Sequence, residues 1–166
     1  MVEVLVAVLV LAIGLLGIAG LQITSIKANH TANTHTQATQ LAYDLADRMR
    51  ANLPGTIAGA YLANAAPNVA YNCFDDFTGV SSGAEDCSPS EMAKADLDWI
   101  FNLASNNLPF VSAAISCTSP GGLTVTVDTG AADCVQGFKH SITITWNEHD
   151  GSNGLVNKSA TLDFQP

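Results

Sequence analysis

The chain has 166 residues, a formal net charge of −9 and only 6 Lys and Arg residues. Such a chain has no basic face that could neutralise phosphates, which argues against nucleic-acid binding. Its length is sufficient for one compact domain with its own core, in addition to an extended N-terminal segment.

An apolar stretch without Asp, Glu, Lys or Arg runs from Val4 to Ile26. At about 1.5 Å per residue, a helix of this length crosses about 30 Å of hydrocarbon. Glu3 stands near its start, and a charge inside such a segment costs on the order of 3 kcal/mol and is a functional candidate. Alternatively, Glu3 simply reaches the membrane interface from near the end of the chain. The whole stretch could also be a cleaved secretory signal, but its acidic start and its length argue against this interpretation.

We expect the helix to continue beyond the apolar stretch, because residues 22–52 contain no proline. Asn52-Leu53-Pro54-Gly55 then predicts a helix stop followed by a turn. The predicted divisions are a lipid-embedded half at 1–26, an amphipathic half at 27–52 that packs on a head, and the head itself at 53–166. Apolar residues recur at helical spacing in the second half: Ala38, Leu41, Ala42, Leu45, Ala46 and Met49.

All four cysteines lie in the expected head, which indicates an oxidising, extracytoplasmic compartment. Cys73, Cys87, Cys117 and Cys134 allow three pairings, which the sequence cannot distinguish, although short spacing favours Cys73–Cys87 and Cys117–Cys134. Each such bridge would add about 3 kcal/mol of stability. A zinc site is disfavoured because the closely paired cysteines of thiolate sites are missing.

A second helix is predicted to begin at Ser88-Pro89-Ser90-Glu91, an N-cap, a first-turn proline and a capping-box glutamate. Asn106-Asn107-Leu108-Pro109 ends it. Its apolar stripe comprises Leu97, Ile100, Phe101 and Ala104. Trp99 lies off that stripe and could meet a second surface, but the simplest interpretation places it in the core at a helix–sheet junction.

The C-terminal third has the period of β-strands, with predicted strands at 123–127, 138–146 and 156–164. Residues 148–154 are rich in turn formers and predict a hairpin between the last two strands. Three strands with one apolar face need a cover, and the amphipathic half of the first helix supplies it. We therefore predict an α+β fold, in which a long N-terminal α-helix packs on a small head with an antiparallel β-sheet.

No pattern of residues indicates an enzyme. His30 and His35 are five residues apart, which does not place them as a helical metal-binding pair, and no pattern joins His140 to His149. Acidic residues within 75–86 could bind calcium, but the sequence lacks the calcium-loop pattern there. We expect no catalytic residue, no metal and no cofactor.

The segment Met1-Val2-Glu3-Val4-Leu5-Val6-Ala7 resembles the class III signal motif of type IV pilins. In that family the mature chain opens with an aromatic residue and its fifth residue is Glu. Glu3 would be that Glu, so that the chain would begin two residues inside the mature protein. Residues 13–22 and 46–52 narrow the resemblance to PilV-type minor pilins, also called type IV pilus modification proteins. The resemblance is strong over the N-terminal third and weaker beyond it, and the basic leader, its Gly and the aromatic residue are absent.

The resemblance implies a non-enzymatic minor pilin that promotes initiation and assembly of the pilus fibre, and so serves twitching motility and adhesion. Glu3 would pair with the α-amine of a neighbouring subunit and set the subunit register. Segment 1–26 would be a membrane anchor before assembly and part of the filament core afterwards. Gly14, Gly17 and Gly20 would either pack closely against other helices or let the helix unwind. Major pilins usually carry a proline at the position of Gly20.

The resemblance also implies partners and location. A prepilin peptidase would process and N-methylate the chain, and other minor pilins, the major pilin and the inner-membrane assembly platform would bind it. The head would be periplasmic before assembly, and the protein would lie in the fibre, near its tip, afterwards. The alternatives are a pseudopilin of type II secretion, which would be favoured by a calcium loop in the head, and a membrane-anchored binding domain or adhesin that does not polymerise.

Overall fold

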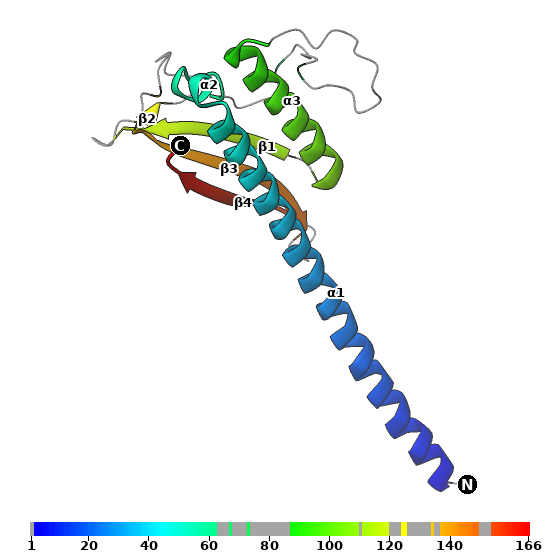
Figure 1. Cartoon of the computed structure of the whole chain (residues 1–166). Coiled ribbons are helices and arrows are strands. Elements are labelled where there is room, and N and C mark those ends of the chain that lie inside the picture. Colours follow the sequence, from blue (N-terminus) through cyan, green and yellow to red (C-terminus); the bar gives the residue numbers. More distant parts are fainter. Residues whose placement is uncertain are drawn as a thin grey trace, which may run out of the picture. The chain divides into compact units, whose positions relative to one another are not determined.

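The computed structural model describes residues 2–62, 67, 73, 87–109, 111–119, 124–125, 134, 137–149 and 154–166. Its contacts divide the chain into two compact units, residues 1–35 and residues 36–166. Helix α1 contributes to both units, and the remaining elements belong to the second (Figure 1). The elements are α1 (Val2–Ala51), α2 (Leu53–Ile57), α3 (Pro89–Asn107), β1 (Val111–Thr118), β2 (Thr124–Val125), β3 (Lys139–His149) and β4 (Leu155–Phe164).

The long first helix is confirmed, since α1 is helical over 50 residues and ends at Ala51. The chain after Ala51 differs from the predicted turn, because Asn52 caps the short helix α2 and accepts a hydrogen bond from the Gly55 amide at 3.3 Å. Pro54 lies in the first turn of α2, where a missing N–H leaves no hydrogen bond unmade. The same proline that forbids continuation of α1 thus permits a new helix after one capping residue.

Helix α3 begins as its sequence predicts. The Ser88 amide donates to Glu91 Oε2 at 2.9 Å, and the Glu91 amide donates to Ser88 Oγ at 3.4 Å, which completes the capping box. The apolar stripe is buried at Leu97, Ile100 and Ala104. The core position expected for Trp99 is wrong, because this side chain is 40% exposed.

The sheet is antiparallel with strand order β2-β1-β3-β4. Strand β1 was not predicted, because its small residues give a weak apolar pattern although Ala113, Ile115 and Cys117 alternate inward. Of the predicted strand at 123–127, the described residues place only Thr124–Val125 in a strand, and the others lie outside the described residues. The turn predicted at 148–154 was too long, because Glu148 and His149 belong to β3.

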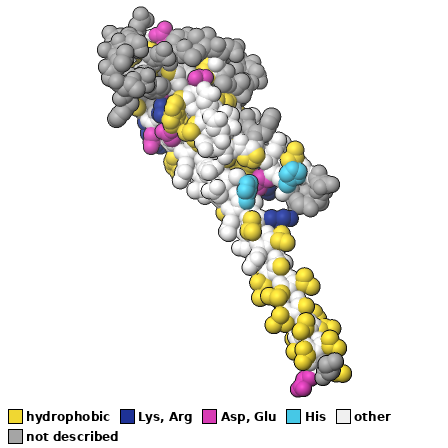
Figure 2. All heavy atoms as spheres, turned by 90° about the vertical axis from the view of Figure 1, so that its right-hand side faces the viewer, with side chains coloured by type: hydrophobic (Ala, Val, Ile, Leu, Met, Phe, Trp, Pro, Cys, Tyr) yellow, Lys and Arg dark blue, Asp and Glu magenta, His cyan; other side chains and the backbone are white. Residues whose placement is uncertain are grey.

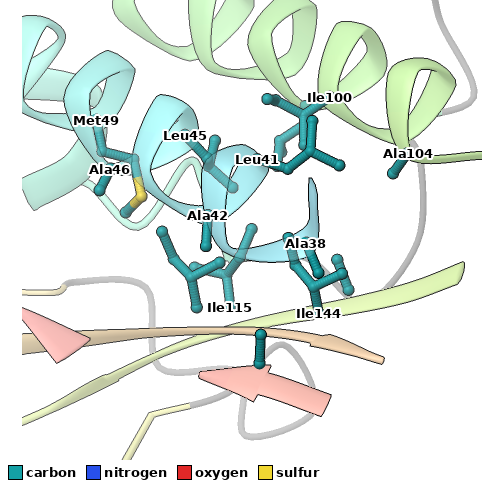
Figure 3. Close-up of a cluster of buried hydrophobic side chains, with 14 of the residues drawn as sticks. Ala38, Leu41, Ala42, Leu45, Ala46, Met49, Ile100, Ala104, Ile115 and Ile144 are labelled. Carbon is teal, nitrogen blue, oxygen red and sulfur yellow. The ribbon is translucent and has the colours of Figure 1, made fainter. Parts of the chain in front are cut away.

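The core lies between the inner face of the sheet and the apolar faces of α1 and α3. Figure 3 shows Leu41 beside Ile100 of α3, whereas Ala42 points towards the sheet. The amphipathic half of α1 therefore covers the sheet, as expected, and each large side chain that it buries stabilises the fold by about 1.5–3 kcal/mol. The α1 residues in this core are Ala38, Leu41, Ala42, Leu45, Ala46 and Met49.

Two disulfides join Cys73 to Cys87 and Cys117 to Cys134. These are the pairs that the short sequence spacing favoured. Cys117 and Cys134 are fully buried and pack against Leu62, so the second bridge forms a small apolar cluster beside the main core. Residue Cys117 also belongs to β1, and the bridge therefore attaches Cys134 to the sheet.

Candidate assembly surface

The N-terminal part of α1 is apolar on every side and has no cover within its own unit. Every Val, Leu and Ile side chain from Val2 to Ile26 is at least 54% exposed. The most hydrophobic stretch of 18 residues in α1 has a mean hydropathy of 2.9, and none of that stretch is buried. The helix is therefore long and apolar enough to cross a membrane. Figure 2 shows hydrophobic side chains all along this part of the helix. A patch of this size requires lipid or other protein surfaces.

Glu3 is exposed and lies in the first turn of α1, where a negative charge interacts favourably with the helix dipole. The open surface beside it is lined by Val4, Ala7, Val8 and Leu11 together with Glu3 itself. Glu3 is the sole charged residue of that lining, and the small side chain of Ala7, one turn away on the same face, leaves room beside the carboxylate. The Glu3 carboxylate is therefore accessible to other molecules.

The glycines at 14, 17 and 20 have no packing role within the described chain. A Cβ at Gly14, Gly17 or Gly20 would meet no heavy atom within 4 Å. Helix α1 continues through all three, and the Thr24 hydroxyl donates to the Gly20 carbonyl at 3.2 Å. Glycine costs about 1 kcal/mol relative to alanine in a helix, and no contact among the described residues accounts for that cost at these three positions.

A charged cluster on the second unit was not predicted. Asp96 of α3 is 3% exposed, and its Oδ1 accepts a hydrogen bond from Arg48 Nη1 of α1 at 2.9 Å. Its Oδ2 accepts a hydrogen bond from the Tyr61 hydroxyl, which itself accepts one from Asn52 Nδ2 at 3.2 Å. Burial and this bond to Asp96 raise the pKa of Tyr61. The Arg48 guanidinium also lies 4.1 Å from the centre of the Trp99 ring, so an ionic network joins α1 to α3.

His140 is the other buried polar residue of note. It is 1% exposed, and neither ring nitrogen has a hydrogen-bond partner. The ring stacks on Phe164 with 5.6 Å between centroids. Burial lowers the pKa of His140, although the backbone groups of Phe138 and Thr56 act weakly in the opposite direction. His140 is therefore a neutral core histidine.

The other titratable side chains that the structure describes do not form a metal site. His30 and His35 lie on α1, and His149 lies at the end of β3. Among the described residues, no group of three or more His, Cys, Asp or Glu could hold a metal ion. The acidic residues within 75–86 lie outside the described residues.

The chain was compared with known proteins at the level of families, curated proteins and structures. Residues 20–98 match the family model of type IV pilin Tt1218, a Tt1218-like family. The match covers a little under half of the 166 residues and extends from Gly20 of α1 into α3. No curated protein and no solved structure matches significantly. The family match, together with the long N-terminal helix packed on a small antiparallel sheet, supports a place for this chain in the type IV pilin superfamily.

Proposed function

We propose that the chain is a minor pilin of the type IV pilus that promotes initiation and assembly of the fibre. The observation that carries the proposal is the uncovered apolar half of α1, with Glu3 at its start. A pilin needs one surface that is soluble in lipid before assembly and packs against other helices afterwards. Residues 1–26 have the length and composition for both states, and residues 36–51 hold the head.

The free energy of helix packing gives Glu3 a different role in this proposal from that of the apolar side chains around it. Lipid tails are about as apolar as leucine side chains, so transfer of the helix from the bilayer into a bundle gains little hydrophobic free energy. A carboxylate without a partner in the same surroundings is costly, and it favours the one register that brings a cation beside it. The exposure of Glu3 beside the small side chain of Ala7 supports this proposal, because a cationic group of another molecule can reach the carboxylate there. Glu3 would therefore select the register of the subunits, and the apolar side chains would hold the packed helices together.

The remaining parts of the proposal concern the compartment, the maturation and the partners that a role as a pilin implies. The head would fold in the periplasm while α1 is anchored in the inner membrane, in agreement with two disulfides. A prepilin peptidase would mature and methylate the chain, and the assembly platform would join it to the major pilin and other minor pilins. A position near the fibre tip would connect it with twitching motility and adhesion.

The test compares Glu3→Ala and Glu3→Gln with the native protein in a piliated strain, and Gln22→Ala serves as a matched polar control on the same apolar segment. Membrane fractionation measures anchoring, and immunoblots of sheared fibres measure incorporation. We expect all variants to stay in the membrane fraction, but both Glu3 variants to be lost from fibres. Unchanged incorporation of both Glu3 variants would contradict the register role, whereas absence of the native protein from sheared fibres would favour an anchored binding domain that does not polymerise.

A further inference from the structure

One buried residue of the head, His140, can change its charge under mildly acidic conditions. It lies on the inner face of β3 and is 1% exposed. The strand register places it between Cys117 of β1 and Phe164 of β4. Its ring stacks on Phe164, and neither ring nitrogen has a hydrogen-bond partner. Because a charged imidazolium has two N–H donors, a proton on His140 requires acceptors that no described residue offers.

The groups around His140 do not compensate a positive charge on its ring. Cys117 is in a disulfide and does not titrate. Arg50 of α1 lies 4.9 Å from the centre of the Phe164 ring and is itself a cation, and its own ion-pair partner is the exposed Asp47. Among the described residues, no carboxylate accepts a hydrogen bond from His140. The closed head therefore holds this histidine in its neutral form, in agreement with the lowered pKa that burial gives it.

The elements around His140 differ in how firmly they are attached. On the side of α2, the buried Thr56 hydroxyl donates to the Met49 carbonyl at 2.7 Å. On the side of β1, the disulfide from Cys117 to Cys134 fixes the chain covalently. Strand β4 pairs with β3 and with no other described strand, so it is an edge strand (Figure 1). Local opening at the last residues of β4 therefore breaks the fewest contacts.

The last residues of β4, 161–164, are called the β4 end here. Their polar side-chain contacts beyond the strand pairing lie at the surface. Lys139 and Asp163 form an ion pair at 2.7 Å, but their side chains are 60% and 44% exposed, so solvent screens the attraction. The Gln165 side chain donates to the Gly137 carbonyl at 2.9 Å, and this bond is also exposed. Neither contact holds the β4 end as firmly as a disulfide or a buried hydrogen bond would.

Water reaches the His140 ring most directly if Phe164 moves, because Phe164 is stacked on that ring. We propose that the β4 end is a pH-dependent cover, which stays paired with β3 while His140 is neutral and detaches when His140 takes up a proton. The opened head would present an unpaired backbone edge of β3, the type of surface to which a further strand can add. The proposal concerns the head alone and does not depend on Glu3 or on the role as a pilin.

The protonation equilibrium gives the direction and the size of the effect. A solvated histidine has a pKa of about 6.5, and burial lowers the pKa of His140 in the closed head. The closed state is therefore fully favoured above about pH 6.5, and opening becomes easier as the pH falls below that value. Each pH unit below about 6.5 raises the opening equilibrium by up to about tenfold, which gives up to about thirtyfold at about pH 5.

The test is amide hydrogen exchange of the full chain in neutral detergent micelles at about pH 7.5 and about pH 5. Protection factors correct for the intrinsic effect of pH on exchange. We expect protection of the β4 end to fall by about tenfold to thirtyfold at the lower pH, while protection of β1 changes by less than about twofold. His140→Phe removes the titrating group and should abolish the difference. His149→Phe is the matched control, because His149 is exposed at the end of β3 and its replacement should leave the difference in place.

Three results would overturn the proposal. Equal loss of protection in β1 and in the β4 end would mean that the whole head unfolds, and loss confined to α2 would place the opening on the helix side. Unchanged protection of the β4 end at the lower pH would show that no opening occurs. If His140→Phe fails to fold, the imidazole resonances of the native protein decide, since protonation of His140 should coincide with loss of protection at the β4 end. Protonation of His140 with the β4 end still protected would refute the proposal.

Discussion

Replacement of Asp96 by Asn tests the ionic network that joins α1 to α3. The Asp96 side chain is 5% exposed and the Arg48 side chain 24% exposed. Removal of one partner from a fully buried pair costs about 3–5 kcal/mol. Arg48 is partly exposed and also lies 3.4 Å from Asp44, so water and a second carboxylate offset part of this cost. We therefore expect Asp96→Asn to lower the free energy of unfolding by about 2–3 kcal/mol.

The chain contains a matched control for this measurement. Asp47 and Arg50 form an ion pair with an N–O distance of 2.7 Å, but the Asp47 side chain is 73% exposed. Asp47→Asn should cost less than about 0.5 kcal/mol, since solvent screens an exposed pair. The assay is urea unfolding in micelles with the disulfides intact, followed by tryptophan fluorescence. Equal costs for the two variants would refute the argument that burial makes the Asp96 pair important.

Two further predictions concern His140 and Gly55. Burial depresses the pKa of His140 in the folded state, so the unfolded chain binds more protons at mildly acidic pH. The contribution of neutral His140 to the free energy of unfolding is therefore complete above about pH 6.5 and is lost as the pH falls through the depressed pKa. Urea midpoints between about pH 7.5 and about pH 5 should show this decline, and His140→Phe should flatten it; an unchanged slope would mean that another group titrates. A Cβ at Gly55 would lie 2.6 Å from the Pro89 carbonyl oxygen, so Gly55→Ala should destabilise the chain by about 1–3 kcal/mol in the same urea assay. A neutral or stabilising result would show that α2 moves away from α3 without cost.

Local signals in the sequence predicted much of the fold. The capping box at Ser88 and Glu91 and the helical spacing from Ala38 to Met49 depend on neighbouring residues, and both appear in the structure. Strand β1 was missed because alternating Ser and Ala residues differ little in hydrophobicity. Its place in the sheet comes from pairing with β3, which is distant in sequence.

The site was predictable only in part. The apolar half of α1 and Glu3 are visible in the sequence, since they lie in one segment. The network around Asp96 is not visible, because it joins Arg48, Tyr61 and Asp96 from separate parts of the chain. The exposure of Trp99 has the same origin, since its ring lies against Arg48 rather than against the sheet. Interactions between distant residues depend on tertiary structure, which periodicity does not specify.

Burial of the apolar half of α1 in the fibre is the central claim of this account, and labelling of Leu15→Cys tests it most directly. Sheared, lipid-free fibres would be treated with a water-soluble maleimide, with Asn29→Cys as the exposed control on the same helix. We predict that Leu15→Cys is incorporated and protected in fibres but labelled after detergent dissociation, whereas Asn29→Cys is labelled in both states. Rapid labelling of Leu15→Cys in intact fibres, or absence of the native protein from fibres, would contradict the account.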